Sequence, residues 1–305
     1  MKNVLKWIGI LVAAAVLLLL VGGAVLYATS SSKLKNGPDV VVEAVPAATG
    51  AEAITRGQHL AVAIGGCTSC HGADLSGLIT VDEPMIGTIY APNLTAGEGG
   101  VGATFTGEDW ARAIRHGIGP DGRVLGGMPS NAFAHLSDDD LADLLAYIQS
   151  VPAVDHIVPE RRLSLPGTII FGTMAYGTLA ANLIDHAAVG GQAPERGETA
   201  AYGEYLTLIA GCHDCHGPDL GGIDPENAPP GPPPGPNLRP NGDLGQWSQE
   251  DFLATLRTGL TPAGRQLSPE MPWQHYALMS NEELGAIWLY LHELDPAAAQ
   301  QRSNE

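Results

Sequence analysis

An unbroken apolar stretch near the N-terminus dominates the hydrophobic pattern of the chain. Residues 7–28, WIGILVAAAVLLLLVGGAVLYA, are 22 uncharged positions, enough for a helix to cross the hydrocarbon core of a bilayer. A cleaved signal peptide normally has a shorter apolar stretch of about 7–15 residues. The pattern favours a retained membrane anchor over residues 1–30, followed by a linker over 31–50. A cleaved signal is the alternative, because residues 28–30, Ala-Thr-Ser, offer a small-residue cleavage site.

Two later segments carry apolar residues at the helical spacing i, i+3, i+4, i+7. This spacing predicts helices over residues 141–148 and 284–291, each with one face in a core. Each segment is preceded by a serine three positions before an acidic residue, the spacing of a capping box. The apolar positions are Leu141, Leu144, Leu145 and Ile148, then Leu284, Ile287, Trp288 and Leu291; the capping pairs are Ser137 with Asp140 and Ser280 with Glu283.

The pattern repeats at long range. FTGEDWARAIRHGIGPDGRVLGGMP, from Phe105, matches WSQEDFLATLRTGLTPAGRQLSPEMP, from Trp247, and APNLT at 91–95 matches GPNLR at 235–239. Such self-similarity indicates two copies of one unit. We therefore predict an all-α protein with two tandem domains, at 51–155 and 196–295, and a polar tail at 296–305.

The segment between the two units, residues 156–195, is apolar but interrupted. Its stretch RRLSLPGTIIFGTMAYGTLAANLIDHAAVG, 161–190, is bounded by charged residues and broken by Gly, Thr and Asn. We expect a helical connector that packs between the domains or lies at the membrane surface, with a docking surface for a partner subunit as the alternative. A second membrane-spanning helix is disfavoured, because it would place the two similar units on opposite sides of the membrane, with the second in the cytoplasm. Residues 227–238, NAPPGPPPGPNL, predict a stiff proline-rich loop.

The formal charge of −18, with 15 basic residues, excludes nucleic acid as a partner. An acidic surface steers a basic partner protein, and it equally keeps a domain outside the cytoplasm soluble.

All four cysteines lie in two similar strings, GCTSCHGADL at 66–75 and GCHDCHGPDL at 211–220. A Cys-x-x-Cys pair is typical of zinc sites, of thioredoxin-like redox pairs and, with a histidine directly after it, of c-type haem attachment. The 141 residues between Cys70 and Cys212 disfavour one shared zinc site. The flanking residues show no strand-like runs, which disfavours the thioredoxin context. We predict thioethers to two haems and a proximal histidine for each iron; the residues are Cys67, Cys70, His71, Cys212, Cys215 and His216.

A methionine-proline pair recurs at the same place in both units. Met128 lies 57 residues after His71, and Met271 lies 55 residues after His216. The proline forces an extended loop that presents the sulfur to the iron. We predict these two as distal ligands, and we expect the other internal methionines, Met85, Met174 and Met279, to be core filler. Five histidines without a counterpart in the other unit are expected to be surface or packing residues: His116, His135, His213, His275 and His292.

Further residues at matching places are candidates for the haem surroundings. Arg115 and Arg257 are candidates for pairing with propionates, or are solvated cations at helix ends. Pro92 and Pro236 are candidates for packing near the proximal histidine, whose second ring nitrogen needs an oriented acceptor such as a backbone carbonyl, or serve only as turn residues. Trp110 and Phe252 line a haem pocket or belong to an ordinary aromatic core.

These motifs resemble class I cytochromes c, and more closely the membrane-attached multihaem cytochrome subunits that accept electrons from bacterial alcohol, aldehyde and gluconate dehydrogenases. The resemblance rests on IGTIYAPNLT, EDWARAIRHGIGPDGRVL, GGMP and LSDDDLADLLAYIQSVP, and covers both units, roughly 200 residues. It implies the same proximal and distal ligands and the same arginine neighbours. Subunits of this type usually carry three haem motifs, whereas this chain has two, which puts the dehydrogenase partnership in doubt.

Ligation by His and Met favours ferrous iron, raises the potential and leaves no open coordination site, which is typical of electron carriers. We therefore expect a non-enzymatic two-haem carrier between a quinol- or substrate-oxidising complex and a downstream acceptor, such as a terminal oxidase or a soluble cytochrome. A two-haem enzyme, peroxidase-like or thiosulfate-oxidising, is the alternative. Because haem is attached outside the bacterial cytoplasmic membrane, we expect a single-pass protein with both haem domains on the periplasmic side. Lys2 and Lys6 favour a cytoplasmic N-terminus, a signal that Lys33 and Lys35 dilute.

Overall fold

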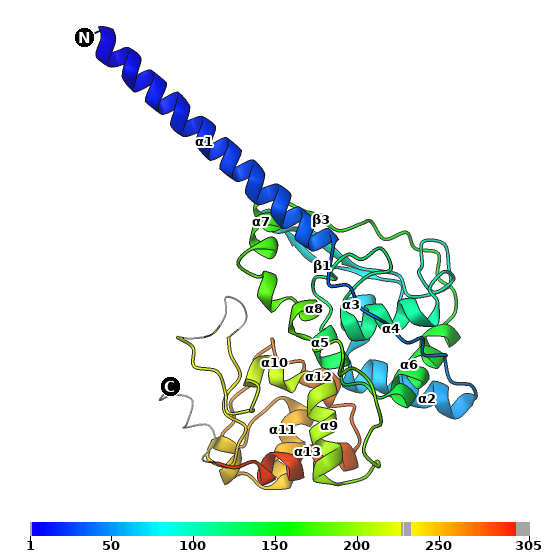
Figure 1. Cartoon of the computed structure of the whole chain (residues 1–305). Coiled ribbons are helices and arrows are strands. Elements are labelled where there is room, and N and C mark those ends of the chain that lie inside the picture. Colours follow the sequence, from blue (N-terminus) through cyan, green and yellow to red (C-terminus); the bar gives the residue numbers. More distant parts are fainter. Residues whose placement is uncertain (1, 227, 229–232, 297–305) are drawn as a thin grey trace.

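The computed structural model describes residues 2–226, 228 and 233–296, and shows one long helix leading into a mostly helical body (Figure 1). The tail predicted from residue 296 lies, from 297 on, outside the described residues, as do 227 and 229–232 of the proline-rich stretch. Within the described part the all-α prediction is confirmed at the level of the class, with one small sheet added to it.

The N-terminal helix α1, Lys2–Lys35, stands away from the body for most of its length (Figure 1). It is long and apolar enough to cross a membrane. The helix continues past the predicted limit at residue 30, so the linker begins after Lys35 rather than at residue 31. The reason is tertiary, since Ser30 and Leu34 are buried against the body.

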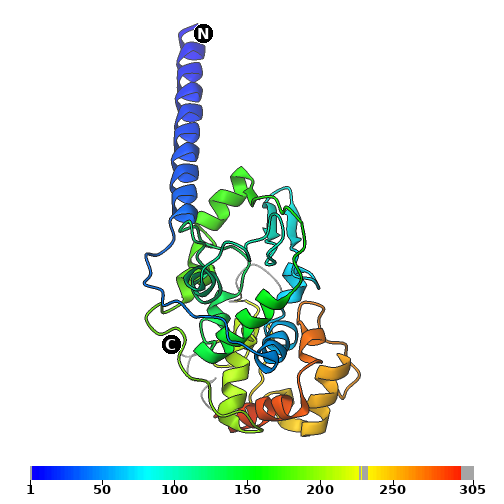
Figure 2. The same ribbon diagram turned by 90° about the vertical axis from the view of Figure 1, so that its right-hand side faces the viewer.

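The last turns of α1 rest on helix α7, Leu165–Gly172. A side chain at Gly172 would place its Cβ only 2.3 Å from the Cβ of Ser30, so the glycine permits the close approach. Lys33 donates from Nζ to the carbonyl oxygen of Gly172 at 3.5 Å and lies 4.9 Å above the ring of Tyr176. Helix α1 is therefore joined to the body by packing as well as by chain connectivity (Figure 2).

Two sets of five segments follow one another in the same order. The first set is α2, Ala51–His59, continued by the π-helical turn η1, Leu60–Ile64; α3, Cys67–His71; α4, Gly107–His116; α5, Ser130–Phe133; and α6, Asp138–Ser150. The second is α9, Ala200–Ile209; α10, Cys212–His216; α11, Gln249–Thr258; α12, Trp273–Tyr276; and α13, Asn281–Glu293, with a 3-10 turn η3, Asp243–Gln246, before α11. We call these sets the first and second repeat. Every residue of the two predicted apolar stripes is buried.

The first and last long helices of each repeat cross in close contact, α2 with α6 and α9 with α13. A glycine lies at each crossing. A Cβ at Gly57 would lie 1.9 Å from the carbonyl oxygen of Asp143, and a Cβ at Gly203 would lie 1.9 Å from that of Ala286. Only a residue without a side chain allows the two backbones to approach so closely.

Serine residues cap the last helix of each repeat, as predicted. Ser280 and Glu283 form a reciprocal capping box at the start of α13. Ser137 accepts from the backbone N–H of Asp140 at the start of α6, but the carboxylate of Asp140 does not return to Ser137. It accepts instead from the hydroxyl of Tyr205 at 2.6 Å and from Arg196 at 2.7 Å, both from the second half of the chain. The predicted capping box is thus only half formed, because the carboxylate of Asp140 binds residues of the second half of the chain instead.

A three-stranded antiparallel sheet lies in the first half of the body. Strands β1, Leu78–Glu83, and β2, Gly87–Ala91, form a hairpin, and β3, Arg162–Leu163, pairs with the start of β2. The pairing of Val81 with Ile89 follows a register shift between Ile79 and Val81, a bulge. The expectation that no strand-like runs flank the first cysteine motif is therefore wrong, since LITV and TIY are rich in β-branched and aromatic residues.

The connector between the repeats is helical, but in short pieces. It contains β3, then α7, the 3-10 turn η2, Tyr176–Thr178, and α8, Ala180–Leu183. Its His186 receives a hydrogen bond from His116 at the end of α4, with the two Nδ1 atoms 2.9 Å apart and the rings stacked. The connector therefore packs on the first repeat and on the base of α1.

The two repeats pack against each other around a single hydrophobic core that includes side chains of both, among them Phe133, Leu136, Tyr205 and Ile209. The polar contacts of this interface come in matching pairs. Asp140, at the start of α6, contacts Tyr205 of α9, while Glu283, at the start of α13, contacts Nε2 of His59 in α2 at 2.9 Å. The same positions of the two repeats thus face each other, as in an isologous two-fold interface.

Candidate functional site

Each Cys-x-x-Cys-His string forms a five-residue helix between two glycines with positive φ. Gly66 and Gly211 precede α3 and α10 in the left-handed region, and Gly72 and Gly217 follow them with φ of 84° and 83°. Three residues after each of the latter glycines, Leu75 and Leu220 also have positive φ, 59° and 58°, although they are not glycine. Both leucines are fully buried. A positive φ is energetically unfavourable for leucine, yet both repeats have it at the same position. We infer that this conformation is needed to position the cysteine strings.

The histidine that ends each string is oriented by the backbone of a later proline. Nδ1 of His71 lies 2.9 Å from the carbonyl oxygen of Pro92, and Nδ1 of His216 lies 2.7 Å from that of Pro236. A carbonyl only accepts, so the proton is on Nδ1 and the lone pair of the neutral ring is on Nε2. Burial lowers the pKa of both imidazoles, which keeps them neutral. Each histidine therefore has the tautomer that a metal ligand requires.

The backbone opposite the second histidine approaches it closely. A Cβ at Gly235 would lie 2.5 Å from Nδ1 of His216, and Gly235 donates its N–H to the carbonyl of Cys215 at 2.8 Å. Glycine in GPNLR, where the first repeat has Ala91, thus allows the chain to pass across this ring.

The four cysteines are free thiols, two in each repeat. Burial raises the pKa of Cys67 and of Cys212 to about 12, and it raises the pKa of Cys70 and Cys215 as well. A thioredoxin-like pair requires a lowered pKa and an exposed thiolate, so the redox-pair interpretation is disfavoured. Among the residues that the structure describes, no group of three or more His, Cys, Asp or Glu side chains is placed to hold a metal ion, and this disfavours the zinc interpretation.

Met128 and Met271 lie at equivalent places, half-buried against the core. In each case the following proline is the N-cap of a short helix, Pro129 for α5 and Pro272 for α12. The carbonyl of each methionine accepts from the backbone N–H two residues later, at 2.9 Å and 2.8 Å. The two methionines therefore share one local geometry as well as one place in the sequence.

The loop before each methionine is also the same. After α4, Gly119 donates its N–H to the carbonyl of Arg123 at 2.8 Å, and after α11, Thr261 donates to that of Arg265 at 2.9 Å. An isolated antiparallel bridge closes each loop, Ile118 with Val124 and Leu260 with Gln266.

The two candidate arginines brace the start of the last helix. Arg115 is buried, donates to the carbonyl of Leu136 at 2.7 Å and pairs with Asp138 at 2.8 Å. Arg257 donates to the carbonyl of Ala277 and to the side chain of Asn281. Arg115 is thus not the solvated cation of the alternative interpretation, whereas Arg257 is only partly buried, and contact with a propionate stays a prediction for both.

Two buried donors on α4 have no acceptor in the described chain, the indole Nε1 of Trp110 and Nε of Arg115. Trp110 stacks edge-on against Phe105, and Phe252 packs against Trp288 in the second repeat. A buried unpaired N–H is costly, and acceptors on a bound group beside α4 would satisfy such donors. These two atoms, together with the neutral histidines and the unpaired thiols, fit a covalently attached haem with carboxylate side chains.

The remaining methionines and histidines differ from one another. Met279 is buried as expected, but Met85 and Met174 are 63% and 80% exposed, so the core-filler prediction is wrong for them. They lie in the hairpin turn and after α7, where no core is within reach. His116 is buried and packs on His186, while His275 contacts the hydroxyl of Ser69 in the first cysteine string. No sequence pattern indicated that second contact.

The His116–His186 pair predicts a pH-dependent stability. Burial is the main reason why the pKa of His116 is lowered to about 4, and His186, Arg112 and Arg115 act in the same direction. In the unfolded chain the pKa returns to about 6.5, so the unfolded state binds more protons between these values and stability falls as the pH drops. We expect His116 to cost about 2 kcal/mol of unfolding free energy between pH 7 and pH 5.

The variant His116→Gln should lack this part of the acid sensitivity. Chemical denaturation of both proteins in detergent at the two pH values checks it, because all carboxylates are common to both and cancel in the difference. An equal slope with pH in wild type and variant would contradict the assignment.

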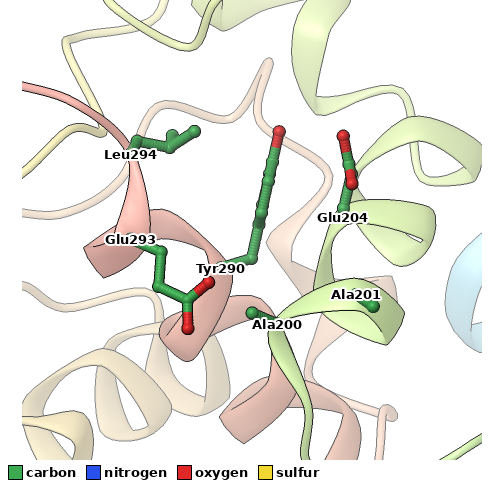
Figure 3. A pocket seen from close by; sticks show the side chains of 6 residues that line it. All are labelled: Ala200, Ala201, Glu204, Tyr290, Glu293 and Leu294. Carbon is green, nitrogen blue, oxygen red and sulfur yellow. The ribbon is translucent and has the colours of Figure 1, made fainter.

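A shallow groove of about 340 Å³ lies between α9 and α13 (Figure 3). Its lining residues are Ala200, Ala201, Glu204, Tyr290, Glu293 and Leu294. None of the predicted site residues is among them. The groove is therefore separate from the cysteine strings and their histidines.

A mostly helical body that presents Cys-x-x-Cys-His strings with metal-ready histidines defines a c-type cytochrome. Comparison with known proteins agrees, since the family described as Cytochrome c matches residues 54–152. The chain is 30% identical to a protein named "Diheme cytochrome c-type" of Cereibacter sphaeroides over 266 residues, 78% of this chain and 84% of that protein. The chain thus belongs to the cytochrome c family.

Other relatives are subunits of larger assemblies. The chain is 31% identical over 283 residues to the fructose dehydrogenase cytochrome subunit of Gluconobacter japonicus, 85% of this chain and 56% of that subunit. It is also 31% identical over 231 residues to the cytochrome c subunit of the alcohol dehydrogenase (quinone) of Gluconobacter oxydans, 68% of this chain and 47% of that subunit. The chain spans about half the length of these two relatives. Family membership implies covalently bound haem c, a cofactor that carries one-electron chemistry.

Proposed function

We propose that the chain is a membrane-anchored two-haem electron carrier on the outer side of the bacterial cytoplasmic membrane. It takes electrons from a quinol- or substrate-oxidising complex and passes them to a downstream acceptor. The observation that carries the proposal is the recurrence, in both repeats, of a five-residue Cys-x-x-Cys-His helix, a histidine oriented by a proline carbonyl, and a half-buried Met-Pro.

The residue roles are the same in each half. Cys67 and Cys70 would hold the first haem through thioethers, and Nε2 of His71 and the sulfur of Met128 would bind its iron. In the second repeat these roles belong to Cys212, Cys215, His216 and Met271. Bound haem iron supplies the one-electron change, and the chain binds, orients and tunes it.

The carbonyls of Pro92 and Pro236 fix the ring planes of the two histidines. We assign Trp110 and Arg115 to the surroundings of the first haem, because each has a buried N–H without an acceptor in the described chain. Arg257 has the matching role in the second repeat.

The partner is proposed from the relatives. Two of them are the cytochrome subunits of fructose and alcohol dehydrogenases, so a membrane-bound dehydrogenase is the electron donor that the comparison favours. The α1 helix anchors the chain, and attachment of haem on the periplasmic side places both repeats there. The acidic charge of −18 favours a basic docking surface on the soluble acceptor.

The haem content tests the proposal directly. Protein matured in a host competent for c-type cytochromes should retain its pigment after acidified organic solvent, and alkaline pyridine spectra should give two haems per chain. The double variant Cys67→Ser/Cys70→Ser should retain one haem, and the matched variant Cys212→Ser/Cys215→Ser should also retain one. Extraction of all the pigment, or a single haem in the wild type, would overturn the assignment.

Carbon monoxide distinguishes a carrier from a two-haem enzyme. We expect no rapid binding of carbon monoxide to the reduced protein at either site, because a thioether occupies each distal position. Stopped-flow absorbance after mixing checks this. Rapid binding at one site would favour the enzyme alternative, in which one haem has an open position.

A further inference from the structure

The middle of each cysteine string contacts the other repeat. The hydroxyl of Ser69, between Cys67 and Cys70, is hydrogen-bonded to Nε2 of His275. Asp214, at the same place between Cys212 and Cys215, accepts from the amide of Asn131 at 2.5 Å. One contact joins the first string to the second repeat, and the other joins the second string to the first repeat.

The partners of these two residues lie just after the methionines. His275 is four residues after Met271, and Asn131 is three residues after Met128. Both belong to the short helices, α12 and α5, that begin after the Met-Pro pairs. Each contact therefore connects the segment that attaches one haem to the segment that supplies the distal ligand of the other.

The backbones at this interface also approach in matching pairs. A Cβ at Gly66 would lie 3.2 Å from the ring of His275, and a Cβ at Gly211 would lie 3.6 Å from the Cβ of Ala132. Gly66 and Gly211 hold the same position before the two strings, and His275 and Ala132 hold the same position in α12 and α5. These matching contacts relate the two repeats by an approximate two-fold axis, which passes between the two cysteine strings.

We propose that the Ser69–His275 and Asn131–Asp214 contacts hold the two sites in register for direct electron exchange within one chain. This rests on the proposed two-haem function. In the exchange one iron is oxidised by one electron as the other is reduced, with no bond formed or broken and no proton transferred. Electron transfer slows steeply with separation and with gaps between packed atoms. His275 and Asn131 act as positioning residues, because each keeps one cysteine string in direct contact with the other repeat.

Each contact completes a continuous route of covalent and hydrogen bonds. One route runs from the thioether-bearing Cys70 through Ser69 and His275 into α12 and back to Met271. The other runs from Cys215 through Asp214 and Asn131 into α5 and back to Met128. One route leads from the first string to the distal ligand of the second haem, and the other leads from the second string to the distal ligand of the first. An electron that moves in either direction therefore has an equivalent route.

The test variant is Asn131→Ala/His275→Ala in the full chain in detergent. Pulse radiolysis or photoreduction delivers one electron, and the relaxation between sites is followed by absorbance; pulsed EPR of the fully oxidised protein reports the magnetic coupling of the two ferric centres. We expect intramolecular exchange to slow at least tenfold and the coupling to weaken, with haem content and methionine ligation unchanged. The conservative variant Asn131→Gln/His275→Gln keeps hydrogen-bonding groups and should recover most of the rate.

The matched control is His59→Gln, which changes the His59–Glu283 contact of the same interface without touching either string. A merely structural role would make this control as slow as the alanine variant, which would overturn the positioning role. An unchanged rate in Asn131→Ala/His275→Ala would overturn it too. Wild-type protein with two haems but no exchange refutes this inference alone, whereas protein with fewer than two haems refutes the proposed function.

Discussion

Replacing Met128 by alanine is expected to lower the reduction potential of the first site and leave the second nearly unchanged. A neutral, polarisable thioether favours ferrous iron, and its loss leaves water or a harder ligand in the distal position. Axial ligands move haem potentials over a range of roughly 0.8 V, and we expect a shift on the order of 100 mV or more. A potentiometric titration followed by absorbance resolves the two sites. The reduced variant should also bind carbon monoxide at one site only.

Two variants control this result. Met271→Ala should produce the same shift at the second site, because its local backbone geometry matches that of Met128. Met174→Ala removes a thioether that is 80% exposed and is not a predicted ligand. The titration of this variant should overlay that of the wild type. A Met128→Ala titration identical to wild type would remove Met128 from the ligand set.

Alanine at Gly57 or Gly203 is expected to destabilise the protein by about 3 kcal/mol, at the upper end of ordinary overpacking. The new Cβ would lie 1.9 Å from a carbonyl oxygen of the facing helix in either case. The two crossing helices must therefore separate by more than 1 Å, roughly, to restore a normal carbon–oxygen contact. Chemical denaturation followed by far-UV circular dichroism and haem absorbance measures the loss.

The matched control is Gly177→Ala. Gly177 has no atom within 4 Å of an added Cβ and an ordinary backbone conformation, so alanine there should be neutral or slightly stabilising. If Gly57→Ala unfolds at the same denaturant concentration as Gly177→Ala, the helices do not cross as closely as described.

The last helix of each repeat, α6 and α13, could be predicted from sequence, because its local signals and its packing agree. The apolar stripes at 141–148 and 284–291 lie on buried faces, and Ser280 with Glu283 caps α13 as its spacing indicates. The repeat also placed the cysteine strings and the Met-Pro pairs at equivalent positions. These features depend on residues close in sequence, where periodicity and capping are informative.

The third strand and the interface could not be predicted, since both depend on distant partners; the β1–β2 hairpin had a local signal that was overlooked. Strand β2 pairs with β3, whose two residues carry no periodic pattern of their own. The contact of Ser69 with His275 joins residues 206 positions apart, and neither side chain is unusual in its local context. Asp140 shows the same limit, because its spacing predicts a capping box, yet its carboxylate goes to Tyr205 and Arg196.

The docking of α1 on α7 restricts how the carrier meets its partners. Ser30 of α1 packs against Gly172 of α7, and Lys33 donates a hydrogen bond to the carbonyl of the same glycine. Helix α1 is therefore packed on the body and is not connected to it by a flexible joint. With α1 crossing the bilayer as proposed, the tilt of both repeats would follow the angle at which this helix crosses the lipid. The proposed carrier would then reach its donor and acceptor by lateral diffusion in the plane of the membrane and not by rotation of the body about a flexible joint.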